Sequence, residues 1–161
     1  MKEKHKHVYM ECAKNFAKLS YAKRKKVGAV VVTPEDVMLY SWNGTATGDD
    51  NCCEKRVYYE RELGHKLSDF PYTDELLERW YKLVTLPTVL HAERNIIAKA
   101  AKEGISLKGS TLFVTMSCCL ECALMIYQAG ISKVVYDEEY RCRDGIDYLI
   151  GHGVEVEKYE Q

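Results

Sequence analysis

Residues 111–130 read TLFVTMSCCLECALMIYQAG, and this stretch decides the fold. Thr111–Met116 is a short, mostly apolar run, which is typical of a buried strand. Residues 119–129 follow as a predicted helix, and Gly130 is a usual helix stop. A strand that leads directly into a helix is the repeating unit of α/β folds.

The same alternation of strand and helix runs through the second half of the chain. Residues 90–102 are predicted to form a helix that stops near Gly104. Farther on, the pattern predicts a strand at 131–136, a helix at 144–150 and a strand at 154–158. This order predicts an α/β sheet that is partly parallel, with helices packed on it.

The first half of the chain predicts a helix, a hairpin and an insertion. Residues 5–19 carry an apolar stripe at helical spacing. The runs 27–32 and 37–42 are predicted to be two strands, joined by a turn at 34–36. Residues 54–87 are charged, aromatic and broken by proline, and we expect them to form a helical insertion.

Composition limits the class of protein. The chain has 161 residues, of which 47% are hydrophobic and 29% charged, as in ordinary globular proteins. No apolar run approaches the roughly 20 residues that span a bilayer. The polar N-terminus has no secretory signal, so we expect a cytoplasmic protein without a membrane partner. The net charge of −1 favours a small substrate over nucleic acid, because proteins that hold long polyanions usually carry a basic excess.

Three side chains at two predicted helix starts suit a zinc ion. The seven cysteines include adjacent pairs, which fit reduced thiols or metal ligands better than a disulfide framework. His91 opens one helix, and Cys119 and Cys122 open another. The gap of two residues lets both sulfurs reach one ion, and catalytic zinc sites leave a fourth position for water. We therefore predict these three residues as zinc ligands.

Glu93 lies two residues after His91, where its carboxylate can reach a metal-bound water without binding the metal. A carboxylate there can take a proton from water and return it to a substrate. Alone, a Cys-x-x-Cys pair can equally be structural, or simply two buried thiols. A closed structural site would need a fourth ligand and would leave Glu93 without a role. His-x-Glu followed by Cys-x-x-Cys is the signature of zinc deaminases.

The chain resembles the deoxycytidylate (dCMP) deaminases, particularly those of the phage type, over nearly its whole length. The stretches that carry the resemblance are residues 20–32, 42–45, 51–54, 91–95, 115–123 and 128–131. The resemblance implies a single deaminase domain over residues 1–161 with a three-layer, cytidine-deaminase-like fold. In that fold a central mixed sheet of about five strands is flanked by helices. A phage protein of this kind would act in the host cytoplasm.

The resemblance implies a hydrolase that converts dCMP to dUMP and ammonia, and so supplies dUMP for thymidylate synthesis. One catalytic Zn²⁺ per chain would be held by His91, Cys119 and Cys122. Glu93 would move protons to the ring nitrogen and the leaving amine. The residues that the resemblance assigns to the substrate are Ser20, Arg24 and Lys25 at the phosphate, Asn43 at the sugar hydroxyl, Tyr140 by the base, and Ala92 and Ser117.

Read without the resemblance, several of these residues have ordinary alternatives. The basic run at 23–26 suits a phosphate, but such a run is often a solvated patch. The pair Asn43-Gly44 is a common turn dipeptide. Tyr140 is one of twelve tyrosines and could be a half-buried aromatic residue.

The resemblance also implies regulation and assembly. Members of the family are commonly activated by dCTP and inhibited by dTTP, and they suggest a homohexamer. The positions implied for an effector, which could bring Mg²⁺ with its triphosphate, are Gly44, Thr45, Asp49, Asn51 and Glu54. A loop this polar could equally be a plain surface turn.

Several positions depart from the family pattern, and two of them bear on the predicted metal sites. Cys118 stands where the family usually has proline, and it leaves a third thiol beside the predicted metal site. Ala22 falls where some phage relatives have a cysteine for a second, structural zinc. That second site is therefore in doubt, and Cys52 and His65 are interpreted as ordinary residues.

Other functions stay open at this point. The same chemistry could act on cytidine, dCTP or a base in tRNA, although the near-zero net charge speaks against tRNA. A non-catalytic, zinc-stabilised nucleotide-binding module is the alternative from another functional class.

Overall fold

The computed structural model describes residues 2–160, and within them a mixed sheet of five strands forms the centre. Its strands are β1 (Gly28–Val32), β2 (Met38–Trp42), β6 (Thr111–Met116), β7 (Lys133–Glu138) and β8 (Glu155–Lys158). Their order is β2-β1-β6-β7-β8. β1 is antiparallel to β2 and β6, whereas β6-β7 and β7-β8 are parallel pairs. The predicted mixed, partly parallel sheet is confirmed.

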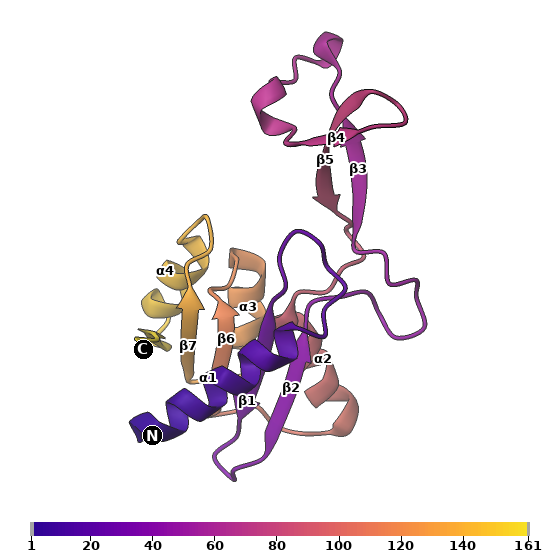
Figure 1. The fold of residues 1–161 in the computed structure, drawn as a ribbon. Coiled ribbons are helices and arrows are strands. Elements are labelled where there is room, and N and C mark those ends of the chain that lie inside the picture. Colours follow the sequence, from indigo (N-terminus) through magenta and orange to yellow (C-terminus); the bar gives the residue numbers. More distant parts are fainter. Residues whose placement is uncertain (1, 161) are drawn as a thin grey trace.

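Among residues 2–160, four α-helices cover the two faces of this sheet (Figure 1). They are α1 (Glu3–Ala17), α2 (Ala92–Glu103), α3 (Leu120–Gln128) and α4 (Asp144–Gly151). α1 packs on one face, and α2, α3 and α4 share a core with the other face. The three-layer architecture expected from the sequence is therefore present. None of the described helices combines the length and apolar character that a membrane crossing demands.

β1 is buried along its whole length because both faces of the sheet are covered. Ala29 and Val31 join the core formed with α2 and α3. Val30 and Val32 join the opposite core, where they meet Met10 of α1. Side chains alternate between the two faces of a strand, so a doubly covered strand requires an unbroken apolar run.

Residues 54–87 differ from the expectation, because they form a second sheet in place of helices. Strands β3 (Glu54–Tyr58), β4 (Tyr72–Asp74) and β5 (Arg79–Thr85) pair antiparallel in the order β3-β5-β4. Two short 3-10 turns, η1 (Arg61–Leu63) and η2 (Leu67–Asp69), lie between β3 and β4. We refer to residues 54–85 as the arm, which projects away from the main sheet (Figure 1).

Aromatic contacts across the strands explain why the arm is a sheet. The ring centroid of Tyr81 on β5 lies 5.9 Å from that of Tyr58 on β3 and 5.4 Å from that of Tyr72 on β4. The guanidinium of Arg56 lies 4.7 Å from the centroid of Tyr81. Aromatic residues favour strands when they find such cross-strand partners. The helical interpretation was wrong because the charged residues in between obscured this pattern.

Candidate active site

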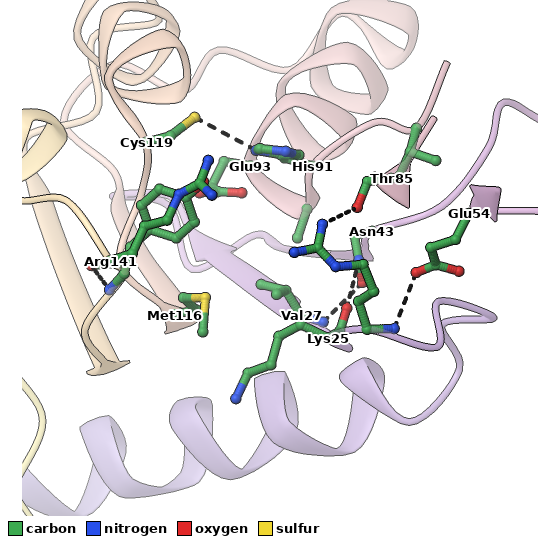
Figure 2. Close-up of a pocket in the computed structure, with 15 residues that line it drawn as sticks. Lys25, Val27, Asn43, Glu54, Thr85, His91, Glu93, Met116, Cys119 and Arg141 are labelled. Atoms are coloured by element: carbon green, nitrogen blue, oxygen red, sulfur yellow. Dashed lines mark hydrogen bonds between the residues drawn. The ribbon is translucent and has the colours of Figure 1, made fainter. Parts of the chain in front are cut away.

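A cavity of about 340 Å³ opens where the arm meets the body of the molecule. Its wall combines the N-terminal ends of α2 and α3, the segment before β1 and the loops after β2, β6 and β7. Both ends of the arm reach it, through Glu54 and Thr85 (Figure 2). Crevices at the carboxyl ends of strands are the usual ligand sites of open α/β sheets.

His91, Cys119 and Cys122 form a group whose ligand atoms lie within 4.8 Å of one another, and we name it the zinc cluster. His91 and Cys119 directly precede α2 and α3, and Cys122 lies in the first turn of α3. His91 Nδ1 is 3.6 Å from Cys119 Sγ and 3.4 Å from Cys122 Sγ. Tetrahedral zinc, with bonds of about 2.3 Å to sulfur and about 2.0 Å to nitrogen, would hold these atoms about 3.5 Å apart. The spacing of the cluster therefore fits zinc.

In the part of the chain that the structure describes, no second group of three His, Cys, Asp or Glu side chains gathers closely enough to hold a metal ion. Cys52 is exposed, and the ring of His65 lies 5.0 Å from that of Phe70. Ala22 is buried in a small apolar cluster with Cys53. The positions considered for a second zinc thus serve other contacts.

The neighbouring thiols of Cys118 and Cys119 differ in their acid–base properties. Hydrogen bonds from the Cys122 thiol and from His91 lower the pKa of Cys119 to about 3, which favours a thiolate. The same contact with Cys119 raises the pKa of His91. Cys118 behaves in the opposite way, because it is 1% exposed and burial raises the pKa of its thiol to about 12. Cys118 lies outside the cluster and stays protonated at neutral pH.

Glu93 lies in the first turn of α2 and lines the cavity beside the zinc cluster (Figure 2). It is 4% exposed, and this burial raises the pKa of its carboxyl above the ordinary value. A carboxyl with a raised pKa holds a proton more readily than an exposed one, which suits a group that has to accept a proton and then pass it on. An ion pair between Arg94 and Glu121 joins α2 to α3 close by, which helps to hold the two helix starts together.

Most of the substrate residues expected from the sequence line the cavity: Arg24, Lys25, Asn43, Ala92, Ser117 and Tyr140. Ser20 differs from these residues, because it is 2% exposed and is not among the residues that line the cavity. Its hydroxyl donates to the carbonyl oxygen of Asn43 at 2.8 Å. Ser20 therefore supports the loop that carries Asn43.

Two residues of the wall use their side chains to hold neighbouring backbone. Asn43 Oδ1 accepts the N–H of Val27 at 2.8 Å, and Asn43 Nδ2 donates to the carbonyl oxygen of Lys25 at 2.9 Å. The Ser117 hydroxyl accepts the N–H of Tyr140 at 2.7 Å. A primary amide has two protons, so Asn43 keeps one for a ligand.

The residues expected at an effector site lie in different surroundings. Asp49 and Asn51 are exposed on the loop after β2. Gly44 exchanges two backbone hydrogen bonds with Leu90, at 3.1 and 2.8 Å, directly before the start of the zinc cluster. Glu54 is 9% exposed and lines the same cavity as Glu93. Glu54 thus belongs to the cavity wall and differs from the exposed loop residues.

The sequence interpretation missed Thr85 and Arg141, which also line the cavity. Thr85 was hidden by the helical interpretation of the arm, since only a strand pairing brings it opposite Glu54. Arg141 follows Tyr140 in the chain, and that adjacency was the available signal.

A sequence profile described as the cytidine and deoxycytidylate deaminase zinc-binding region matches residues 3–138. The chain belongs to this family. The deaminase is 33% identical over 149 residues to the deoxycytidylate deaminase of Enterobacteria phage T4, covering 81% of this chain and 77% of the relative. It is 30% identical over 155 residues to the deoxycytidylate deaminase of Schizosaccharomyces pombe, covering 94% of this chain and 42% of the relative.

A solved structure extends the likeness to almost every residue. It is the dCMP deaminase of cyanophage S-TIM5 in complex with dCMP and dUMP, which is 43% identical to this chain. The two structures superpose with a TM-score of 0.77, covering 99% of each chain. This confirms the cytidine-deaminase-like fold. Deaminases are hydrolases, so the chain is an enzyme of that class.

Proposed function

We propose that this deaminase hydrolyses dCMP to dUMP and ammonia, and so supplies dUMP for thymidylate synthesis. The observation that carries the proposal is a single cavity that joins Glu93 and the zinc cluster to the basic residues Arg24 and Lys25. Deamination of cytosine requires activated water and a proton carrier, and a 5′-phosphate requires cations. The cyanophage relative, which carries dCMP and dUMP, supports the choice of substrate.

The zinc cluster would hold one Zn²⁺ per chain in this proposal. The interatomic distances in the cluster and the lowered pKa of Cys119 support this assignment. When bound, the ion supplies Lewis-acid activation of water near neutral pH.

Glu93 carries the protons. Its carboxylate takes a proton from the attacking water while the water oxygen bonds to C4 of the cytosine ring. Glu93 then protonates N3, takes the second proton of the added hydroxyl and delivers it to the amino group. The C4–N bond breaks and ammonia leaves, so water and dCMP become dUMP and ammonia. The burial of Glu93 and its raised pKa support this exchange.

Tyr140 and Asn43 would orient the nucleoside. Tyr140 packs by the base, and the hydrogen bond from its N–H to Ser117 holds its backbone in place. Asn43 directs its remaining amide proton to the sugar hydroxyl, since its other polar groups already bind the backbone. Ala92 is fully buried in the wall, where it leaves room for the ring.

Arg24 would carry most of the phosphate recognition. Lys25 already pairs with Glu138 at 2.6 Å, which offsets its charge. Arg24 donates to the hydroxyl of Thr85 and forms no ion pair with a carboxylate within residues 2–160. A guanidinium offers two parallel donors that match phosphate oxygens.

We further propose that the deaminase is a homohexamer that dCTP activates and dTTP inhibits, with Mg²⁺ bound to the triphosphate. The backbone bridge between Gly44 and Leu90 supports this regulation. A movement of the loop that contains Gly44 would shift Leu90 and, with it, the next residue in the chain, His91. The test is a dCMP saturation curve with and without each effector, together with the molar mass from light scattering. Hyperbolic curves that ignore both effectors would refute regulation, and a monomeric mass would refute the hexamer.

The substrate proposal is tested by ammonia release from dCMP, CMP, dCTP and deoxycytidine at fixed zinc. We expect the highest kcat/KM for dCMP and a loss of at least about tenfold for deoxycytidine, because Arg24 then lacks its anion. Equal values for dCMP and deoxycytidine would contradict the phosphate role. Zinc-loaded protein that releases no ammonia from any of the four would instead favour a non-catalytic nucleotide-binding module.

A further inference from the structure

Glu54 is a buried carboxylate at the edge of the cavity that the proposed reaction does not use. It opens β3, it is 9% exposed, and it lines the cavity on the side where the arm begins (Figure 2). A buried carboxylate is costly unless it accepts hydrogen bonds, so its partners indicate its purpose.

The carboxylate of Glu54 binds the backbone of the segment before β1. The N–H of Lys23 donates to both of its oxygens, at 3.0 and 3.1 Å, and the N–H of Arg24 donates to one of them at 3.1 Å. Residues 20–27 form neither helix nor strand, so these N–H groups have no partner in a helix or sheet, and the carboxylate of Glu54 supplies one. Glu54 thereby holds the backbone of Arg24 at the cavity.

The side chain of Arg24 is held from the other end of the arm. Its Nη1 atom donates to the hydroxyl of Thr85 at 3.1 Å (Figure 2). Glu54 and Thr85 are cross-strand partners in β3 and β5. This one residue pair of the arm therefore binds both the backbone and the guanidinium of Arg24. The oxygens of Glu54 accept backbone protons, which leaves the charge of Arg24 available to an anion.

We propose that Glu54 is a positioning residue for the substrate phosphate. It fixes the backbone of Arg24 so that the guanidinium meets the 5′-phosphate of a nucleoside monophosphate. This rests on the proposed function, since it requires a nucleotide in this cavity. It also gives the arm a purpose, because the first and last residues of its sheet form part of the substrate site.

The test uses the zinc-loaded full chain and the substitution Glu54→Ala. Steady-state kinetics are measured with dCMP and deoxycytidine, and the affinities for dUMP and deoxyuridine are measured by calorimetry. We expect KM for dCMP and Kd for dUMP to rise about tenfold, while kcat for dCMP changes by less than about twofold. The values for deoxycytidine and deoxyuridine should stay within about twofold, because neither carries a phosphate.

Three further variants separate positioning from a general effect on folding. Glu54→Gln keeps one acceptor oxygen for the two N–H groups and should restore part of the loss. Thr85→Val removes the anchor of the guanidinium and should raise the same KM. Glu62→Ala alters an exposed residue of the arm and should change nothing. Zinc content and circular dichroism identify any variant that is misfolded.

Equal losses with dCMP and deoxycytidine, or a fall in kcat at constant KM, would overturn the positioning role. So would a Glu54→Ala variant with wild-type constants. If Glu54→Ala is misfolded, Glu54→Gln and Thr85→Val decide by the same criteria. A wild-type protein that binds dUMP but does not deaminate dCMP would refute the proposed function alone, and the dUMP affinities would still test Glu54.

Discussion

Cys118 and Cys119 are neighbours in the chain with opposite chemistry. Cys119 stands at the start of α3, where hydrogen bonds from Cys122 and His91 lower its pKa to about 3. Cys118 is almost fully buried, and burial raises its pKa to about 12. The Cys119 thiol therefore ionises readily, which favours binding of a cation, whereas the Cys118 thiol packs in the core as an apolar side chain.

This difference predicts that Cys118→Ala keeps its zinc, whereas Cys119→Ser loses it. Cys118→Ala should cost about 1 kcal/mol of stability, because a buried sulfur is removed from the core. The measurement is zinc per chain by mass spectrometry after exhaustive dialysis, with a thermal melt for stability. Loss of zinc from Cys118→Ala would identify Cys118 as a ligand and contradict the assignment.

At the scale of residues, the sequence motifs predicted which side chains lie together where their spacing along the chain determines this. The zinc cluster and Glu93 follow from His-x-Glu and Cys-x-x-Cys at helix starts, because the start of a helix fixes where these side chains point. The direction of Ser20 and Glu54 depends on contacts with distant segments, 23 and 31 positions away along the chain. Local sequence cannot encode such contacts, so the burial of Ser20 and the place of Glu54 in the cavity wall were not predicted.

At the scale of elements, α4 packs against the proposed metal site through a glycine. A Cβ atom on Gly145 would lie 2.3 Å from the carbonyl oxygen of Cys118 and 2.9 Å from that of Cys119. These are backbone atoms of the turn that carries Cys119, and they cannot move without displacing that turn. The first turn of α4 therefore packs directly against the zinc cluster.

Gly145→Ala should displace this turn, lower the affinity for zinc and destabilise the fold by about 2 kcal/mol or more. The matched control is Gly151→Ala in the same helix, where an added Cβ meets nothing within 4 Å. That control should be neutral or slightly stabilising, because alanine favours a helix. Competition with a chelator measures the zinc affinity of both variants, and thermal melts measure their stability. Equal behaviour of the two variants would contradict the close packing of α4.

The arm has its own anchor in Asp74. The Tyr58 hydroxyl donates to it at 2.9 Å, Arg56 at 2.6 Å, and the N–H groups of Leu76 and Leu77 at 3.2 Å each. The Tyr58 hydroxyl, with the other donors, holds the pKa of Asp74 below its ordinary value. A lowered pKa means that the carboxylate stabilises the arm above about pH 4 and that this contribution is lost as pH falls through the lowered value.

Asp74→Asn should therefore loosen the arm without unfolding the body. We expect amide hydrogen exchange in β3, β4 and β5 to become several-fold faster, with unchanged protection in the main sheet. Wild-type protein should show the same local loosening in acid. Glu75→Gln, at the neighbouring exposed position, is the control. Faster exchange throughout the molecule would contradict an independent anchor.

At the scale of the whole molecule, the sequence predicted the body and not the arm. β1 and β6 are apolar runs, and Gly104 ends α2 with a left-handed φ of 67°, so both features leave a local signal. In the arm, strand pairs such as Glu54 with Thr85 join residues far apart in the chain. The arm buries little of its surface, so a clear alternation of apolar and polar residues was never required.

In the proposed reaction, Glu93 moves protons beside a zinc ion that it does not bind. Glu93→Gln tests it most directly, since zinc per chain and ammonia release from dCMP can be measured on one sample. We expect about one zinc per chain and a turnover that falls by about a hundredfold to ten thousandfold. Unchanged turnover in the zinc-loaded variant would contradict it.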